Sequence, residues 1–333
     1  MSTDTPDISV IIVSFNTCDL LLECLQTLQT QAGGVRYETI VIDNASQDGS
    51  ADMVEREFPD VQLIRSTENL GFAAGNNLGF AQARGHYVVL LNSDAFLKPQ
   101  ALSKALAYMQ AGSKNPKIGV GGARLVGPDG TWQPSARMFP NLLNNFLTLS
   151  GLAAKYPHSR FFGRVDRTWA DPDQAAIVDW VPGAFSIMPR HVLDEVGYFD
   201  ENFFLYYEEV DLCKRIQAKG YNICYWPDVV VVHLGGESSK TLKDLKISST
   251  GKQITLWQMR SALLFYRKHY GALSAWLWMQ MENLWLMLRA LKNGWSKQAD
   301  KQQKAAYSKT MRRLLRQAWH DTQGGRISPP RPW

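Results

Sequence analysis

The N-terminal part of the chain alternates between continuous apolar runs and segments with helical spacing. The run ISVIIVSF is rich in β-branched residues, which is typical of a strand buried on both faces. The segment CDLLLECLQTLQTQ repeats apolar residues at helical intervals and ends just before Gly33 and Gly34, so it predicts a helix. The pattern predicts strands at 8–15, 38–44, 61–66 and 86–94 and helices at 18–31, 46–58 and 71–84. This β-α-β-α-β-α-β order implies an α/β fold with a parallel sheet and right-handed crossovers.

The pattern is less regular after the fourth predicted strand. Residues 119–139 favour short strands and turns, and residues 140–176 fit no single element. The remaining pattern predicts a strand at 178–190, a short helix running into a loop at 191–204, an amphipathic helix at 208–220, and one or two strands at 221–236.

The last 80 residues differ from the rest in charge and composition. From residue 254 onward there are 14 Lys and Arg against 3 Asp and Glu, a net charge of +11, whereas the whole chain carries +5. The window 272–291 is long enough to span a membrane, but polar and charged residues interrupt it: Gln280, Glu282, Asn283 and Arg289. We therefore expect one domain over 1–250 and a basic, Trp-rich helical region over 251–333.

This C-terminal region is expected to contact an anionic partner. Its mixture of Trp, Leu, Met and basic residues favours a helix that lies in a membrane interface, and it favours lipid over nucleic acid. The alternative is a helical hairpin that packs either on the body of the same chain or on a second subunit. In the second case the protein would be a homodimer.

Cysteine usage and the N-terminus point to the cytoplasm. The four cysteines show neither C-x-x-C nor C-x-x-H spacing, so we expect reduced thiols rather than a zinc knuckle or a disulfide framework. The segment MSTDTPDISV has no basic region followed by an apolar run, which argues against export.

Polar side chains stand at the carboxyl ends of the predicted strands, where α/β sheets bind ligands. Asp43 could accept hydrogen bonds from a nucleobase or a ribose, or it could cap the helix expected near Gln47. Asp94 and His233 each follow an apolar run, so together they could hold Mg²⁺ or Mn²⁺. Taken alone, Asp94 is a weak indication, and a histidine at a strand end is more often structural.

Three carboxylates fall within four positions behind a set of aromatic residues. The stretch FFLYYEEVDLCKR places Glu208, Glu209 and Asp211 at the start of a predicted helix. Neighbouring acids raise one another's pKa, which makes a carboxylate a better base, whereas the helix N-terminus favours the charged form. Acidic residues are also favoured in any first helical turn, and without other motifs that structural interpretation is the stronger one.

Seven ordered segments together resemble one enzyme family. They are ISVIIVSFN, VIDNASQDGS, NLGFAAGNNLG, LLNSDA, WVPGAFSIMPR, FFLYYEEVDLCKR and VVHLGGESS, and they span about residues 8–240. In this order they resemble family 2 glycosyltransferases with the nucleotide-sugar-binding GT-A fold, especially the rhamnosyltransferase-like enzymes that build bacterial O-antigen, capsule and cell-wall polysaccharides. The resemblance implies a mainly parallel central sheet flanked by helices, to which this chain adds a C-terminal helical extension.

The resemblance also implies roles for individual residues toward a nucleotide-sugar. Ser14, Phe15 and Asn16 would line the base pocket, and Asp43 would contact the pyrimidine. Four residues would lie around the nucleoside and phosphates of the donor: Arg65, Asn69, Gly71 and Asn77.

The resemblance likewise implies which residues bind the metal and which face the sugars. Asn92-Ser93-Asp94 stands where the family has its Asp-x-Asp metal motif, and because its first position is Asn, Asp94 is expected to make the metal contact. His233 matches the family's later metal-ligand histidine. Trp180, Gly183 and Ala184 match the segment that faces the donor sugar and the acceptor.

In the family, the acidic pair at the head of the helix supplies the general base, usually through its second member, which is often Asp. Here that member is Glu209, and we expect it to be the base, with Glu208 as the alternative. Asp211 is expected to orient its neighbours or to bind acceptor hydroxyls.

The resemblance implies inverting, metal-dependent transfer of a sugar, L-rhamnose from dTDP-rhamnose, to a saccharide on a polyprenyl diphosphate carrier. It places the enzyme peripherally on the cytoplasmic face of the membrane. Two other hypotheses stay open: a related transferase that uses a UDP- or GDP-sugar, and a non-catalytic scaffold that binds nucleotide or membrane. The presence of Asp94, Glu209 and His233 argues against the scaffold.

Overall fold

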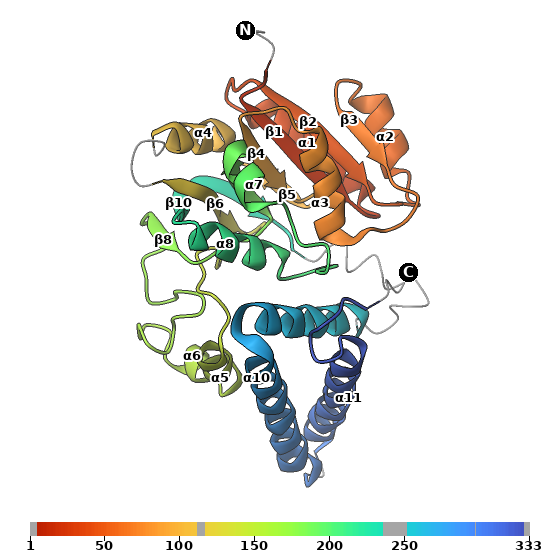
Figure 1. Ribbon diagram of the computed structural model, residues 1–333, viewed down its shortest axis with the longest axis vertical. Coiled ribbons are helices and arrows are strands. Elements are labelled where there is room, and N and C mark those ends of the chain that lie inside the picture. The colour runs from red at the N-terminus through yellow and green to blue at the C-terminus, as the bar shows by residue number, and fades with distance from the viewer. Residues whose placement is uncertain (1–4, 112–116, 236–251, 297, 330–333) are drawn as a thin grey trace.

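The computed structural model describes residues 5–111, 117–235, 252–296 and 298–329. An α/β body forms the upper part of the molecule in Figure 1, and long C-terminal helices extend below it. In the described chain, ten strands form one sheet: β1 (Ile8–Ser14), β2 (Tyr37–Asp43), β3 (Gln62–Arg65), β4 (Tyr87–Leu91), β5 (Ala95–Leu97), β6 (Ile118–Val126), β7 (Trp132–Gln133), β8 (Ala176–Val178), β9 (Phe185–Pro189) and β10 (Asn222–His233).

The N-terminal half of the sheet is parallel, in the order β3-β2-β1-β4. Because side chains alternate along a strand, Ile11 and Ile40 face one side of the sheet and Val10 and Val41 face the other. One side is covered by α1 (Cys18–Gln31), α2 (Ser50–Glu57) and α4 (Ala101–Ala111), the other by α3 (Gly71–Gln82), α7 (Arg190–Val196) and α8 (Glu208–Ala218). The alternation of strands and helices predicted for this half is confirmed.

Beyond β4 the sheet is mixed. β9 is antiparallel to both β4 and β6, β10 is parallel to β6, and β5 is antiparallel to β10. Parallel pairing is therefore continuous only over β3-β2-β1-β4, and the sheet as a whole is mixed rather than mainly parallel. The single strand predicted at 178–190 is also corrected, since β8 and β9 are separate and do not pair with each other. Pro182, which cannot donate a ladder hydrogen bond, lies between them.

The register of β10 places one residue of the candidate site. The segment predicted as one or two strands is a single strand whose register shifts between Trp226 and Val230, around Pro227. After this irregularity, His233 pairs with Ala95 of β5. Since β5 follows the end of β4 so closely, this pairing brings the end of β10 next to Asp94.

The segment that fitted no single element contains α5 (Leu142–Leu149) and α6 (Leu152–Lys155). Asn141 caps α5, because its side-chain oxygen accepts a hydrogen bond from the Asn144 backbone N–H.

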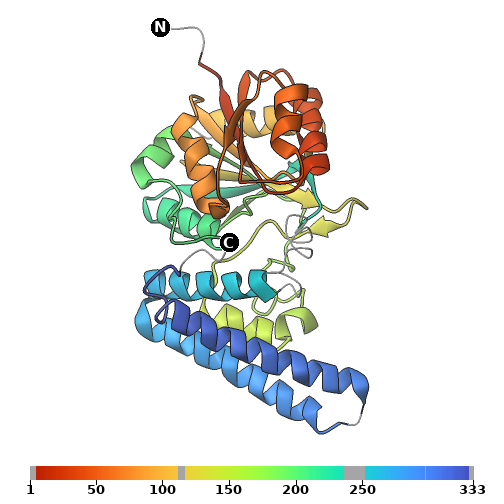
Figure 2. The same cartoon turned by 90° about the vertical axis from the view of Figure 1, so that its right-hand side faces the viewer.

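The C-terminal region consists of α10 (Lys252–Gly294) and α11 (Ala299–Asp321). A kink divides α10 at Gly271, where φ is 86° and ψ is 172°, a conformation essentially restricted to glycine. The first part of α10 lies beneath the α/β body, and the second part pairs with α11 in a hairpin that reaches away from it (Figure 2). The expected helical extension is confirmed, and in the described residues none of the helices has the length and apolar character needed to span a membrane.

Candidate active site

A pocket of about 310 Å³ lies at the carboxyl ends of the parallel strands, and the start of α8 contributes to its lining. Eleven of the residues expected at the site line it: Phe15, Asn69, Gly71, Asn92, Ser93, Asp94, Gly183, Ala184, Glu208, Glu209 and His233. These residues come from segments spread over more than 200 positions of the sequence. The sheet brings them together because parallel strands end at the same edge.

Asp94 and His233 lie next to each other in the lining of this pocket. The His233 Nε2 atom lies 3.5 Å from the Asp94 carboxylate, and the Asp94 side chain is buried. The other ring nitrogen of His233, Nδ1, lies 3.2 Å from the side-chain oxygen of Gln133 in β7. If Nδ1–H donates that hydrogen bond, the Nε2 lone pair is directed toward the pocket.

This pair of side chains fits a divalent cation. A carboxylate oxygen and an imidazole nitrogen suit Mn²⁺, and Mg²⁺ is accommodated by a carboxylate with phosphate oxygens. Within the described ranges, no group of three His, Cys, Asp or Glu side chains is arranged around a common centre. Among the described residues, Asp94 and His233 are therefore the two candidate ligands, and a bound diphosphate and water would have to supply the others.

Glu208 and Glu209, at the start of α8, also line the pocket. Burial and the charge of Glu209 raise the Glu208 pKa well above its ordinary value. Burial also raises the Glu209 pKa, while backbone N–H groups and the Arg137 guanidinium act in the opposite direction. Each carboxyl group has one buried oxygen, Oε2, with no hydrogen-bond partner in the described structure. Glu208 therefore takes up a proton more readily, and Glu209 is the member of the pair more easily ionised.

The segment leading into α8 has an unfavourable backbone conformation. Tyr206 and Tyr207 both adopt left-handed φ angles, 68° and 72°, which typically cost about 1 kcal/mol or more for each non-glycine residue. Side-chain packing compensates, since the Tyr207 ring lies 5.3 Å from that of Phe265 in α10. The Ser261 hydroxyl also donates a 2.8 Å hydrogen bond to the Leu205 carbonyl. Thus α10 holds the turn that aims the acidic pair into the pocket.

A second buried network shapes the wall formed by the start of α3. The Asn44 amide donates to the Asn69 side chain and to the Gly71 carbonyl, and its oxygen accepts from the Leu70 N–H. Gly71 has a φ of 80°, and a Cβ there would lie 2.3 Å from the Phe204 carbonyl oxygen, so only glycine fits. Asn44 and Gln133 were not identified from sequence. Of these two residues, only Asn44 had a feature in the sequence that could have indicated a role at the site, namely its place at the end of a predicted strand.

Three residues expected at the base pocket are engaged near it. Ser14 is fully buried and bonds Thr17, whose hydroxyl reaches Ser93 in the pocket wall. The side-chain oxygen of Asn16 accepts a hydrogen bond from the Gln47 N–H. One Asp43 oxygen accepts from the Ser46 N–H, and the other is buried without a partner among the described residues. Asp43 does not cap a helix at Gln47, because α2 begins later, at Ser50.

Four other expected residues do not line the pocket and contact other parts of the protein. Arg65 is on the surface and pairs with Asp52 and Glu55 of α2. Asn77 donates to the Phe199 carbonyl and to Glu201. Trp180 donates to the Met138 carbonyl, and the Arg137 guanidinium covers its ring.

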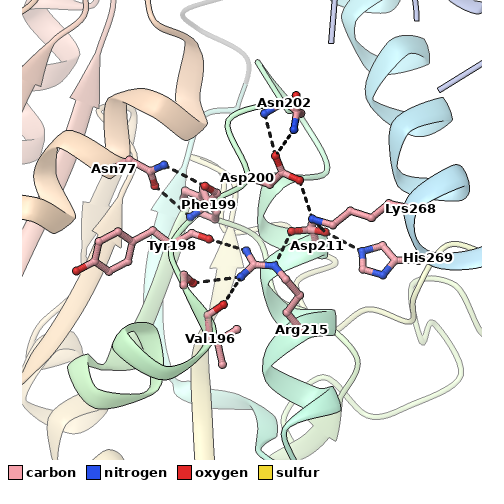
Figure 3. A network of polar contacts seen from close by, with 11 residues as sticks. Asn77, Val196, Tyr198, Phe199, Asp200, Asn202, Asp211, Arg215, Lys268 and His269 are labelled. Carbon is pink, nitrogen blue, oxygen red and sulfur yellow. Dashed lines mark hydrogen bonds and ion pairs between the residues drawn. The ribbon is translucent and has the colours of Figure 1, made fainter. Parts of the chain in front are cut away.

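Asp211 is the fourth, and it faces away from the pocket toward α10. Its carboxylate accepts hydrogen bonds from Arg215 and His269 and pairs with Lys268 (Figure 3). The same figure shows Asp200, which shares Lys268, and the bonds between Asn77 and Phe199. Asp211 is fully buried and thus fastens α8 to α10.

The comparisons with known proteins agree on one family. Residues 9–166 match the model of Glycosyl transferase family 2. The chain is 28% identical over 205 residues to an N-acetylglucosaminyl-diphospho-decaprenol L-rhamnosyltransferase of Mycobacterium tuberculosis, covering 58% of this chain and 65% of that protein. It is 24% identical over 241 residues to the O-antigen biosynthesis protein RfbC of Myxococcus xanthus, covering 69% of this chain but 17% of that protein. The chain thus spans less than two thirds of the length of these relatives.

A solved structure supports the fold assignment. The mannosyltransferase PcManGT of Pyrobaculum calidifontis, in complex with GDP-Man and Mn²⁺, superposes with a TM-score of 0.53 over 97% of this chain and 89% of its own. The two sequences are 17% identical, so the likeness concerns the fold alone. It confirms the GT-A-like architecture.

Proposed function

The chain carries a glycosyl transferase family 2 domain, and from this premise we propose that it is an inverting, metal-dependent glycosyltransferase of cell-surface polysaccharide synthesis. The observation that carries the proposal is that one pocket is lined by Asp94, His233, Glu208 and Glu209. The first two residues suit a metal-bound diphosphate, and the acidic pair supplies a general base for an acceptor hydroxyl.

Glu209 is assigned as the base. Burial raises the pKa of both carboxyl groups, and the charge of Glu209 raises the Glu208 pKa further, whereas the Arg137 guanidinium favours the ionised form of Glu209. Glu209 takes the proton of the acceptor hydroxyl as that oxygen bonds to the anomeric carbon. The bond between this carbon and the diphosphate oxygen breaks, and the nucleoside diphosphate leaves from the opposite face. One displacement of this kind inverts the anomeric configuration.

Asp94 and His233 would hold the cation, Mg²⁺ or Mn²⁺. When bound, the ion neutralises charge that develops on the leaving diphosphate. Gln133 orients the His233 ring, and Asn44 and Gly71 shape the wall beside the donor site. The walls contributed by Phe15, Phe72 and Phe204 are apolar, which suits the stacking and desolvation of a nucleoside.

For the donor we propose dTDP-L-rhamnose, and for the acceptor a saccharide on a polyprenyl diphosphate at the cytoplasmic membrane face. The support is the mycobacterial relative, which is named as a rhamnosyltransferase that acts on an N-acetylglucosaminyl-diphospho-decaprenol acceptor. The alternative donor is a UDP- or GDP-sugar, as the GDP-Man bound to the structural neighbour illustrates for that protein.

Calorimetry with dTDP, UDP and GDP, each with Mn²⁺ and with EDTA, tests the donor and the metal together. We expect dTDP to bind most tightly and only with Mn²⁺. Asp94→Asn should weaken Mn²⁺-dependent binding at least about tenfold, or roughly 1.4 kcal/mol, because the carboxylate ligand is lost. Asp300→Asn, a surface change on α11, is the control and should leave binding unchanged.

The outcomes of this experiment separate the hypotheses. A preference for UDP or GDP would keep the mechanism and change the donor. Equal affinity with EDTA, or an unaffected Asp94→Asn variant, would remove the metal site. Folded protein that binds none of the three nucleotides would favour the non-catalytic scaffold.

A further inference from the structure

The second part of α10 exposes a continuous row of large apolar side chains. The row consists of Leu273, Leu277, Leu284, Leu288 and Leu291 and is continued by Trp295 directly after the helix. Their spacings of three, four and seven residues place them on one side of a helix. Between 39% and 89% of each residue is exposed to solvent. We call this set the leucine stripe.

The leucine stripe contributes nothing to the core of the hairpin. The opposite side of the same helix carries the buried residues Ala275, Trp278, Leu286 and Ala290. The polar residues that interrupt the apolar sequence also lie on packed sides, since Glu282 accepts a hydrogen bond from Asn145 of α5 and Asn283 accepts one from Arg312 of α11. A helix needing only to pair with α11 would be polar where the stripe lies, so the stripe indicates a further contact.

The charge around the stripe is complementary to an anionic surface. Arg289 and Lys292 directly follow Leu288 and Leu291 and are exposed, as are Lys301 and Lys304 at the beginning of α11. The region after residue 253 has a net charge of +11. In a two-fold dimer formed through the stripe, two such cationic hairpins would lie side by side and repel each other. The charge therefore disfavours a second copy and favours anionic lipid.

We propose that the leucine stripe docks on an anionic phospholipid membrane. Its side chains enter the boundary between headgroups and acyl chains, while the neighbouring Arg and Lys side chains contact the phosphates. Trp295, at the tip of the hairpin, suits this boundary because its ring is amphipathic. The helix lies along the surface, with its packed side turned toward α11 and α5.

This docking would also fix the position of the pocket relative to the membrane. The first part of α10 carries Ile254, which lines the pocket, and Ser261, which holds the turn before α8. A single helix with one kink at Gly271 therefore connects the leucine stripe to the acidic pair. The docking would present the pocket to a lipid-linked acceptor, and this part of the inference rests on the proposed function. The docking itself does not depend on catalysis.

Co-sedimentation of the full chain with vesicles tests the docking, without donor or acceptor present. Vesicles of phosphatidylglycerol and phosphatidylcholine in equal parts should bind the protein, pure phosphatidylcholine should bind it weakly, and added salt should weaken the first interaction. Leu284→Gln with Leu288→Gln should lower the affinity about tenfold or more. Arg289→Gln with Lys292→Gln should lower it only for the anionic vesicles.

The matched control is Ile177→Gln, which changes an equally exposed apolar residue on β8, far from the hairpin in sequence. It should bind vesicles like the unchanged protein. Unchanged vesicle binding by the Leu284/Leu288 variant would overturn the proposal. So would a dimer of the unchanged protein, seen by sedimentation velocity, that this variant dissociates while its vesicle binding stays unchanged. Vesicle binding with no detectable sugar transfer would count against the proposed function and not against the docking.

Discussion

Replacing Glu209 by Gln is expected to abolish sugar transfer while leaving nucleotide binding intact. A positioned general base contributes about 10²–10⁴-fold to a rate, so turnover should fall at least about 100-fold. Gln has the size of Glu and keeps its place at the start of α8, but it cannot take the proton of the acceptor hydroxyl. Initial rates of transfer report the loss, and calorimetry with the preferred nucleotide and Mn²⁺ shows that the donor site is preserved.

Glu208→Gln is the matched control for this experiment. Burial and the neighbouring Glu209 hold the proton on Glu208, so a neutral amide resembles its native state. We expect a rate loss of less than about tenfold, well below that of a missing base. If Glu208→Gln is the more damaging change, the two roles are exchanged. Full turnover by Glu209→Gln would remove Glu209 from the mechanism.

Local patterns predicted the parts of the fold that depend on local interactions. The helix expected at 18–31 has the same bounds in the structure. Its apolar residues recur at helical spacing, and they form the side of the helix that is buried. The carboxyl ends of β1, β2 and β4 meet at one edge for a simple geometric reason, the parallel pairing of their strands. Asn92, Ser93 and Asp94 could therefore be placed at a site before the structure was known.

Long-range pairing explains what the sequence could not reveal. Gln133 reaches His233 only because β7 folds back on β6, and nothing in its own segment marks it. Similarly, the mixed half of the sheet depends on which distant strands pair. Arg65 and Asn77 belong to segments that reach the site, but their side chains contact α2 and the loop before α8, which no local pattern indicates.

Asp211 shows the same limit within a single helix. Residues two apart on a helix do not face the same way, so Glu209 and Asp211 project in different directions. The sequence grouped three acids, whereas the structure divides them into a pair in the pocket and one residue bound to α10 (Figure 3). Its partners Lys268 and His269 are nearly 60 residues away, which no local pattern indicates.

Asp211→Asn is expected to destabilise the protein by about 3 kcal/mol at neutral pH. Removing one member of a buried ionic network leaves the remaining charges without compensation, which typically costs about 3–5 kcal/mol. Arg215, whose guanidinium lies 2.8 Å from Asp211, loses its carboxylate partner, and Lys268, whose ammonium lies 2.7 Å from Asp211, keeps only Asp200. Because the network joins α8 to α10, the loss should appear in the free energy of unfolding measured with urea.

The control for Asp211→Asn is Asp300→Asn. Asp300 also pairs with a cation four residues later, at 2.7 Å from Lys304, but it is largely exposed, so the change should cost less than about 0.5 kcal/mol. Equal effects of the two variants would show that the buried network does not stabilise the fold more than a surface pair does.

The pH dependence gives an independent test of the same network. Burial alone would raise the pKa of Asp211, but the hydrogen bond from His269 and the charges of Arg215 and Lys268 outweigh it and lower the pKa to about 2. Since this lies below the unfolded value of about 3.9, the ionised group stabilises the fold above about pH 4. That contribution is lost as the pH falls from about 4 to about 2. The difference in unfolding free energy between the unchanged protein and Asp211→Asn should therefore shrink over this interval, and a constant difference would mean that the charge of Asp211 is not what stabilises the junction of α8 and α10.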